Sequence, residues 1–368
     1  MDFELDDEQV ELRRVVRDVA ERECPAALVR AVVGGSDDGS GLWKTFVELD
    51  WPSLTVPAGD GGMGMSAVEL VITLEELGRV ADPTPFLATT SQYVAVLREC
   101  AGPDGRAPLL AAVCAGGTGA AAFAAGAAQA RSDGDGWLLG GRARHVIDGD
   151  RADEIAVVAA TEAGAGAFVV PVGDVAVTRE PTFDGSFHLA TVDLDGVRVA
   201  GDRAFTGPGV EAGVERARQE AVTGLAAVMV GASQRVLDTV VAHVKERRQF
   251  GVPIGSFQAV KHMAVDVYVA IERARALCHF AALTIAEDDP RRELAASLAK
   301  TAAGDCQRIA AQHGVQLFGG LGFTWENDLQ IYLRRAKVGE PLLGSTTEHR
   351  ARAARLVLAG HAATEVDG

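Results

Sequence analysis

Three stretches with different spacings of apolar residues follow one another along the chain. In the first, apolar residues recur every three or four positions, as in the run from Asp6 to Glu23, where Asp6 can cap the first turn and Pro25 ends the pattern. A second such run, SAVELVITLEELGRVA, follows a glycine-rich turn at Gly59–Met65 and carries its apolar residues along one face. The spacing predicts that roughly the first 115 residues are helical.

The spacing changes between about Ala120 and Phe205. Short valine-rich runs such as EIAVVAA and AFVVPV are separated by Gly, Asp and Pro, which predicts a small antiparallel β domain. From about Gly209 the helical spacing returns. Three long helices and two shorter ones are expected over residues 209–246, 257–286, 292–317, 327–336 and 346–358, which is typical of a helical bundle.

These patterns predict a fold that is mainly α with a central β domain. A chain of 368 residues is longer than one typical domain, so several lobes are expected. We place a helical N-terminal domain at residues 1–115, a β-rich middle domain at 116–207 and a C-terminal helical bundle at 208–368.

The charge balance excludes one class of partner. The chain has 35 Lys and Arg against 51 Asp and Glu, a net charge of −16, and no basic run that would follow a phosphate backbone, so nucleic acid is not expected.

No stretch approaches 18 consecutive bulky apolar residues, so we expect no membrane span. The N-terminus is acidic and amphipathic, without the features of a secretory signal.

The five cysteines favour a reducing compartment. They are odd in number and form no CxxC or CxxxC pair, which argues against a disulfide framework or a zinc site, and a cytoplasmic protein is expected. His262 and Asp266 have the spacing of two ligands on one helix, but no third ligand is near them. We therefore expect no metal site and interpret both as polar residues within the bundle.

Three separated motifs carry more specific information. The sequence ERRQFGVPIGSFQ at residues 246–258, followed by His262 and Asp266, is similar to the acyl-CoA dehydrogenase pattern ERxxFGxPIxxFQxxxHxLAD. QLFGGLGF at residues 316–323 and RRAK at 334–337 resemble the QxxGGxGF and RDAK motifs of that family. Upstream, TVPAGDGGMGM and LEELGR look like its xxPxxxGGxG and EELGR motifs. Because the motifs stand in family order over nearly the whole chain, the chain resembles acyl-CoA dehydrogenases.

The resemblance implies a fold and a cofactor. The fold is acyl-CoA dehydrogenase-like, with a helical N-terminal lobe, a central β barrel and a C-terminal four-helix bundle, assembled as a dimer or a dimer of dimers. The cofactor is FAD, part of which is held in the family by residues of the neighbouring subunit. Carried over by position, these residues are Arg247, Gln249, Phe250, Gln316, Gly319 and Gly320. Their chemistry agrees, since arginine offers paired donors to a pyrophosphate and glycines let backbone amides approach a ligand.

The resemblance also shows a departure at the residue that removes the α-proton of the substrate. In most family members this base is the glutamate of a YEGT tetrapeptide, which falls here on residues 342–345 and places Leu343 at the position of the base. A minority of members carry the glutamate on the first bundle helix, at a position that falls on Ala221. Glu220 is adjacent and is an alternative base, but one residue turns a helix by about 100°, so it should face elsewhere on a regular helix.

Three other titratable residues lie near the expected loop. They are Glu340, Glu348 and His349. An exposed loop or the start of a helix explains each of them more simply than a catalytic role does.

Two segments of the predicted β domain depart from the family as well. The flavin- and thioester-contacting TEPxAGSD loop of relatives corresponds to AFAAGAAQARSDGDGW at residues 122–137, which lacks its Thr and Glu. The WITN segment, whose aromatic side chain packs beside the flavin ring, corresponds to His145–Asp148. The resemblance therefore implies that the half-site donated to a neighbour is retained while the chain's own flavin-ring site is eroded.

Three functions follow from these patterns. The first is α,β-desaturation of an acyl-CoA thioester with FAD, in a hetero-oligomer whose second acyl-CoA dehydrogenase subunit supplies the base, as in bacterial α2β2 relatives that act on bulky thioesters including sterol side-chain CoA esters. The second is a homo-oligomeric flavoenzyme with a displaced base such as Glu220. The third is a non-redox protein of the same fold. For the first two, the resemblance implies an electron-transferring flavoprotein as acceptor.

Overall fold

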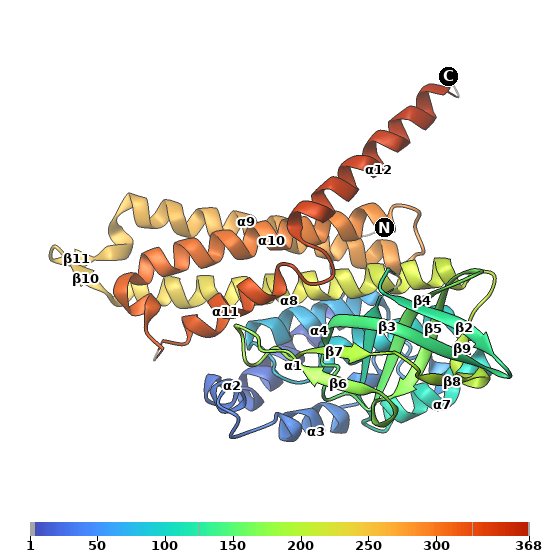
Figure 1. The fold of residues 1–368 in the computed structure, drawn as a ribbon. Helices are drawn as coiled ribbons and strands as arrows, with labels where there is room; N and C mark the ends of the chain where they lie inside the picture. Colours follow the sequence, from blue (N-terminus) through green and yellow to red (C-terminus); the bar gives the residue numbers. More distant parts are fainter. Residues whose placement is uncertain (1–3, 125, 326, 367–368) are drawn as a thin grey trace. The chain divides into compact units, whose positions relative to one another are not determined.

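The computed structural model of the chain describes residues 4–124, 126–325 and 327–366 (Figure 1). The predicted order of helices, strands and helices is confirmed. The first helices are α1 (Asp7–Glu23), α2 (Ala26–Val33), α3 (Ser40–Glu48), α4 (Ala67–Arg79), α5 (Phe86–Ala88), α6 (Val94–Cys100) and α7 (Pro103–Cys114). The last helices are α8 (Val210–Glu246), α9 (Gln258–Ala286), α10 (Arg292–Phe318), α11 (Leu329–Gly339) and α12 (Thr346–Val366).

Local signals account for the helix ends. Asp6 caps α1 as expected, because its side chain accepts from the N–H of Gln9 at 2.8 Å while the Gln9 side chain accepts from the N–H of Asp6 at 3.3 Å. Pro25 separates α1 from α2. The last helix is longer than its apolar spacing predicted and continues from Leu358 to Val366.

The described chain packs as two compact units. The first contains residues up to Arg30, Val71–Asp82 and residues from Val222, and the second contains Ala31–Leu70 and Pro83–Ala221. The three domain boundaries placed from the sequence stay a prediction.

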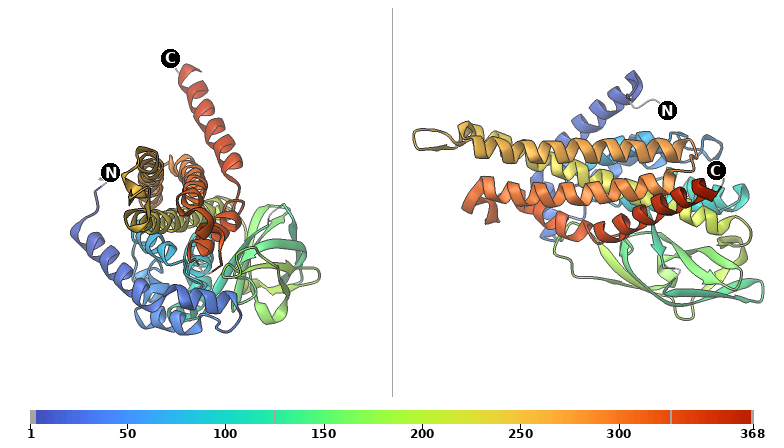
Figure 2. Two further views of the ribbon diagram at one scale, coloured as in Figure 1. Left: turned by 90° about the vertical axis from the view of Figure 1, so that its left-hand side faces the viewer. Right: turned by 90° about the horizontal axis from the view of Figure 1, so that it is seen from above.

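The first unit is helical. Helices α8, α9 and α10 lie side by side, and the C-terminal part of α12 extends away from α9 and α10 (Figure 2). Between α8 and α9 the chain forms a short hairpin of β10 (Arg248–Gln249) and β11 (Val252–Pro253). The apolar face predicted for α4 is only part of its buried surface, because Thr73, Glu75 and Glu76 are buried too.

The second unit is built on a nine-stranded sheet. Its strands are β1 (Gly119–Phe123), β2 (Ala128–Asp133), β3 (Gly136–Ile147), β4 (Glu154–Thr161), β5 (Gly164–Pro171), β6 (Ala176–Arg179), β7 (Leu189–Asp193), β8 (Arg198–Ala200) and β9 (Ala204–Phe205). The prediction of an antiparallel domain is wrong in one respect, since β1 and β2 both pair parallel with β4. Strand β3 runs antiparallel to β2, and the chain then reverses again into β4, so β4 runs in the same direction as β2.

Strand β4 is buried on both faces, which explains its continuous apolar run. On one face Ala156 and Val158 pack with residues of α6 and α7, while on the other Ile155 and Val157 pack with Leu139 of β3. Strands covered on both sides read as unbroken hydrophobic segments.

One described helix, α8, is long and apolar enough to cross a membrane by length and composition alone. Of the most apolar 18-residue window of α8, 67% is buried inside the structure. Burial of this kind is typical of a core helix, so its apolar character is explained by packing.

The crossing of α4 and α8 leaves no room for a side chain. A Cβ added at Gly231 would lie 1.8 Å from the carbonyl oxygen of Glu75, and one added at Gly78 would lie 2.3 Å from that of Val228. We expect Gly231→Ala to lower the free energy of unfolding by about 1–3 kcal/mol, because the two backbones must separate. Chemical denaturation measures this change.

Gly41→Ala in α3 is the matched control, since no atom lies within 4 Å of its added Cβ. It should leave stability unchanged or raise it, because alanine favours helix. Equal stability of Gly231→Ala and the wild type would contradict the close crossing.

Candidate functional site

A glycine turn follows the end of α10. Gly319 has φ 62° and ψ −141°, a conformation that a residue with a Cβ rarely adopts. Gly319 and Gly320 are exposed, and no atom lies within 4 Å of a Cβ added to either. Gln316 is exposed one turn earlier on α10. The backbone amides of this turn are therefore open to a ligand.

The second predicted group of ligand-binding residues lies on the β10–β11 hairpin. Phe250 and Gly251 form its turn with φ 52° and 81°, the left-handed pair expected for a two-residue hairpin. Phe250 is 92% exposed, and Arg247 and Gln249 are exposed as well. The hairpin thus presents a guanidinium, an amide and an aromatic ring.

A ring contact joins these two segments. His243, one turn before Arg247, stacks on Phe318, directly before Gly319, with ring centroids 4.3 Å apart and an interplanar angle of 14°. Burial and the charge of Arg247 lower the pKa of His243. The hairpin and the end of α10 lie at the same end of the helical unit (Figure 1). The structure therefore places the segments that carry the six predicted half-site residues at one end of the helical unit, where the ends of α8 and α10 are in contact.

Leu343, which the sequence predicts at the position of the base, lies in the loop between α11 and α12. It has φ 55°, its side chain is half-buried, and its carbonyl oxygen is 2.9 Å from Nε2 of His349. An aliphatic side chain cannot accept a proton, so Leu343 cannot itself act as a base.

A buried lysine holds this loop from inside. Lys300 of α10 has no exposed surface, and its Nζ donates to the carbonyl oxygens of Glu340 at 2.8 Å and Gly344 at 3.0 Å. Burial lowers its pKa to about 8. The sequence reasoning missed Lys300, although a single lysine among the alanines of an apolar helix is a visible signal.

The three titratable residues near the loop have structural contacts. Glu348 forms a cap with Ser345 at the start of α12, accepting from its N–H at 2.8 Å, as the helix-start interpretation requires. The Oε1 of Glu340 accepts from the N–H of Thr346 at 2.9 Å. His349 lies in the first turn of α12, in agreement with the helix-start interpretation, and is buried with Nε2 2.9 Å from the carbonyl oxygen of Leu343.

Glu220 of α8 is also buried. Its Oε2 accepts from NH2 of Arg98 at 2.5 Å, whereas its Oε1 has no hydrogen-bond partner among the described residues. The ion pair with Arg98 fixes the position of this carboxylate on α8. Ala221, the family position, is fully buried.

His262 and Asp266 are exposed on α9, so their interpretation as residues within the bundle is wrong. The face of α9 that carries them is turned away from the core. Within the described ranges, no group of three or more His, Cys, Asp or Glu side chains is arranged to hold a metal ion.

Comparison of the chain with known proteins identifies its family. One family model, the N-terminal domain of acyl-CoA dehydrogenases, matches residues 6–117, and a second, the C-terminal domain, matches residues 213–358. The chain belongs to the acyl-CoA dehydrogenase family. The resemblance stated from the motifs and the acyl-CoA dehydrogenase-like fold class are therefore confirmed.

Relatives of known name align with nearly the whole length of this chain. Acyl-CoA dehydrogenase IpdE2 of Mycolicibacterium smegmatis is 31% identical over 353 residues, covering 95% of this chain and 98% of the relative. A chain of the ChsE4-ChsE5 complex from Mycobacterium tuberculosis is 26% identical with a TM-score of 0.90, covering 97% and 99%. A chain of the Tcur3481-Tcur3483 steroid ACAD, a G363A variant, is 28% identical with a TM-score of 0.87, covering 97% and 99%.

This acyl-CoA dehydrogenase has an unusual segment in the middle of β3. At His145 the pairing of β3 with β7 slips, and His145 has φ 57°. Glu180 holds it, with Oε1 accepting from the backbone N–H at 3.1 Å and Oε2 lying 2.6 Å from Nδ1. A histidine hydrogen-bonded to Glu180 therefore lies at the position that the motif comparison aligned with the aromatic residue of the WITN segment. In the 122–137 segment, Ala125 lies outside the described residues.

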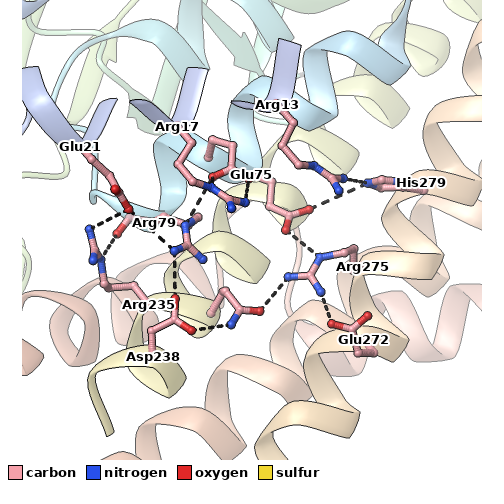
Figure 3. Close-up of polar contacts among 12 residues, drawn as sticks. Arg13, Arg17, Glu21, Glu75, Arg79, Arg235, Asp238, Glu272, Arg275 and His279 are labelled. Carbon is pink, nitrogen blue, oxygen red and sulfur yellow. Dashed lines mark hydrogen bonds and ion pairs between the residues drawn. The ribbon is translucent and has the colours of Figure 1, made fainter. Parts of the chain in front are cut away.

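The EELGR motif has a structural role in this acyl-CoA dehydrogenase. The buried carboxylates of Glu75 and Glu76 pair with Arg275 at 2.8 Å and Arg17 at 2.6 Å, within a network of four helices (Figure 3). In the RRAK motif, Arg335 is buried and donates to the carbonyl oxygen of Asp82 at 3.1 Å. Both motifs therefore stabilise the helical unit.

The buried charge of Lys300 predicts a pH dependence of stability. Its pKa is lowered from 10.5 to about 8 in the folded protein, so between these values the unfolded chain binds the extra proton. Stability must then rise with pH over this window. We expect the unfolding free energy of the wild type to gain roughly 3 kcal/mol relative to Lys300→Met from pH 8 to pH 10.5.

Denaturant titrations at several pH values measure this difference. Lys261→Met is the control, because Lys261 is exposed on α9 and its removal should leave the pH profile unchanged. If the unfolding free energies of the wild type and Lys300→Met changed with pH in the same way, the lowered pKa of Lys300 would be contradicted.

Proposed function

We propose that this chain is one subunit of a hetero-oligomeric, FAD-dependent acyl-CoA dehydrogenase that introduces a double bond between the α and β carbons of an acyl-CoA thioester. One observation carries the proposal. The open turn at Gly319 and Gly320 and the exposed Arg247 hairpin follow two helix ends that are in contact through His243 and Phe318, whereas Leu343 falls at the position of the base. The chain thus has residues for a donated half-site and lacks its usual proton acceptor.

The residues present fit the pyrophosphate and adenosine part of FAD. Arg247 offers a planar fork of donors to a pyrophosphate, and the amides of Gly319 and Gly320 are unobstructed by side chains. Gln316, Gln249 and Phe250 add amide groups and a ring on the same exposed surface. The segment expected beside the flavin ring does not fit in the same way, because His145 is hydrogen-bonded to Glu180 there.

The proton chemistry favours a second chain. FAD, when bound, supplies the acceptor for the hydride that leaves the β carbon. A base must remove the α-proton at the same time, and Leu343 cannot. Glu220 is held by Arg98. We infer that the partner subunit carries the glutamate, while Arg247 and the glycine turn of this chain hold and orient the cofactor.

Exposed apolar side chains support an assembly. Six lie on the hairpin and the first half of α9, namely Phe250, Val252, Phe257, Val265, Tyr268 and Val269. Large apolar side chains gathered on one surface mark an interaction site. The ChsE4-ChsE5 relative is named as a complex and the Tcur3481-Tcur3483 relative as a steroid enzyme, which supports a two-chain assembly acting on a steroid-derived thioester.

The proposal also includes an electron acceptor and a cellular compartment. An electron-transferring flavoprotein is the proposed electron acceptor, by the family resemblance stated from the motifs. All five cysteines are free, which suits a cytoplasmic protein.

The half-site predicts a selective loss of cofactor. In the assembly recovered from the host with this chain as bait, Arg247→Ala should lower bound FAD about ten-fold or more at limiting FAD, since a charged pyrophosphate contact is lost. Flavin absorbance per protein measures occupancy. Arg248→Ala is the matched control, an exposed neighbour expected to leave occupancy unchanged.

The FAD-to-chain ratio of this chain purified alone tests the pairing. We expect a colourless or substoichiometric protein. One FAD per chain, reduced by acyl-CoA without a partner, would overturn the hetero-oligomer and favour a homo-oligomeric enzyme. Unchanged occupancy in Arg247→Ala would overturn the half-site.

Glu220 gives a separate test of the base. Because the partner is proposed to supply the base, Glu220→Gln should keep turnover per bound FAD within about three-fold of the wild type, although loss of the Arg98 pair lowers stability. Steady-state assays of the assembly measure the turnover. A loss of several orders of magnitude would instead identify Glu220 as the base.

A further inference from the structure

Two guanidinium groups lie over the indole ring of Trp325. The guanidinium carbon of Arg30 is 5.2 Å from the ring centroid, and that of Arg334 is 4.8 Å from it. Such cation–π contacts are attractive because the ring face carries negative charge. Trp325 is 44% exposed, so filling the core does not explain its place.

Arg30 also binds the backbone and side chains around Trp325. Its NH1 donates to the carbonyl oxygen of Trp325 at 2.6 Å, and its NH2 and Nε donate to Oδ1 of Asp328 at 2.8 and 3.0 Å. Arg30 belongs to α2, almost 300 residues away in the chain. One side chain therefore ties the segment after α10 to a distant helix.

This tie lies just beyond the glycine turn. Among the described residues, the side-chain amide of Gln330 donates to the carbonyl oxygen of Gly322, whereas no atom lies within 4 Å of a Cβ added at Gly319 or Gly320. On its N-terminal side, Phe318 stacks on His243. On its C-terminal side, Thr324 donates to the carbonyl oxygen of Leu321 at 3.1 Å, and Trp325 follows. The turn is thus supported on both sides by ring contacts.

We propose that Trp325 and Arg30 are positioning residues for the Gly319–Gly320 turn and hence for the pyrophosphate and adenosine part of FAD. The inference rests on the proposed function, since it concerns the same half-site. Its physical reason is preorganisation. A glycine turn has many accessible conformations when it is free, and a ligand that must order it binds more weakly than a ligand that finds it ordered.

The test uses two measurements on variants of the full chain. Hydrogen exchange of the FAD-free chain reports the order of the amides at residues 320–324. FAD titration of the assembly recovered from the host, after removal of its flavin, reports affinity. Trp325→Ala and Arg30→Ala should exchange faster at residues 320–324 and bind FAD roughly ten-fold more weakly, with an unchanged melting temperature.

Matched variants make the result specific. Trp325→Phe keeps a ring face and should restore FAD affinity to within about three-fold of the wild type. Arg291→Ala removes a comparable pair elsewhere in the same unit, since Arg291 lies 5.4 Å from the Phe280 ring centroid and is ion-paired with Asp289 at 2.6 Å. It should change neither exchange at residues 320–324 nor FAD affinity.

Several outcomes would overturn the inference. Faster exchange with unchanged FAD affinity would show that the tie orders the turn without serving the cofactor. Weaker FAD binding without faster exchange would assign Trp325 to direct contact with FAD instead of positioning. If Arg247→Ala lowers FAD occupancy while the Trp325 and Arg30 variants change nothing, the positioning role fails and the proposed half-site stands. If Arg247→Ala also has no effect, the half-site itself fails.

Discussion

Two adjacent carboxylates buried on α4, Glu75 and Glu76, set the arrangement of the helical unit. A buried charge without a partner is strongly unfavourable, so the helices around α4 must bring cations to these positions. Arg17 comes from α1 and Arg275 from α9, and each contact is shorter than 3 Å (Figure 3). Helix α8 approaches α4 closely enough only because Gly231 has no side chain. Charge pairing and close backbone packing therefore reinforce each other at one crossing.

This rigid centre has a consequence at the far end of the bundle. Helix α10 packs on α9 and α12, and α8 is held against α4 by their close crossing. The C-terminal ends of α8 and α10 are joined by the His243–Phe318 stack, so the hairpin and the glycine turn that follow them start from adjacent helix ends. Polar and glycine-rich segments of this kind have little packing of their own, and they take their positions from the helices that precede them.

Contacts to its backbone shape the loop between α11 and α12. Lys300 binds the carbonyl oxygens of Glu340 and Gly344, and Nε2 of His349 lies 2.9 Å from the carbonyl oxygen of Leu343. These contacts do not involve the side chain of Leu343, so the shape of the loop does not depend on the chemistry of that side chain.

The sequence by itself determined the order of helical and strand segments and the family, because these depend on local spacing and on motifs that are contiguous in the chain, whereas the half-site residues stay a prediction. The cap at Asp6 and the ends of α8 and α10 follow from short-range interactions that any reader of the sequence can find. Tertiary structure alone decided the parallel pairing of β1 with β4, the burial of Lys300, the pairing of Glu220 with Arg98 and the contacts of Arg30 and Arg334 with the ring of Trp325. Each of these joins residues that are distant in sequence, and a charged residue has the same local pattern whether it faces water or a buried partner.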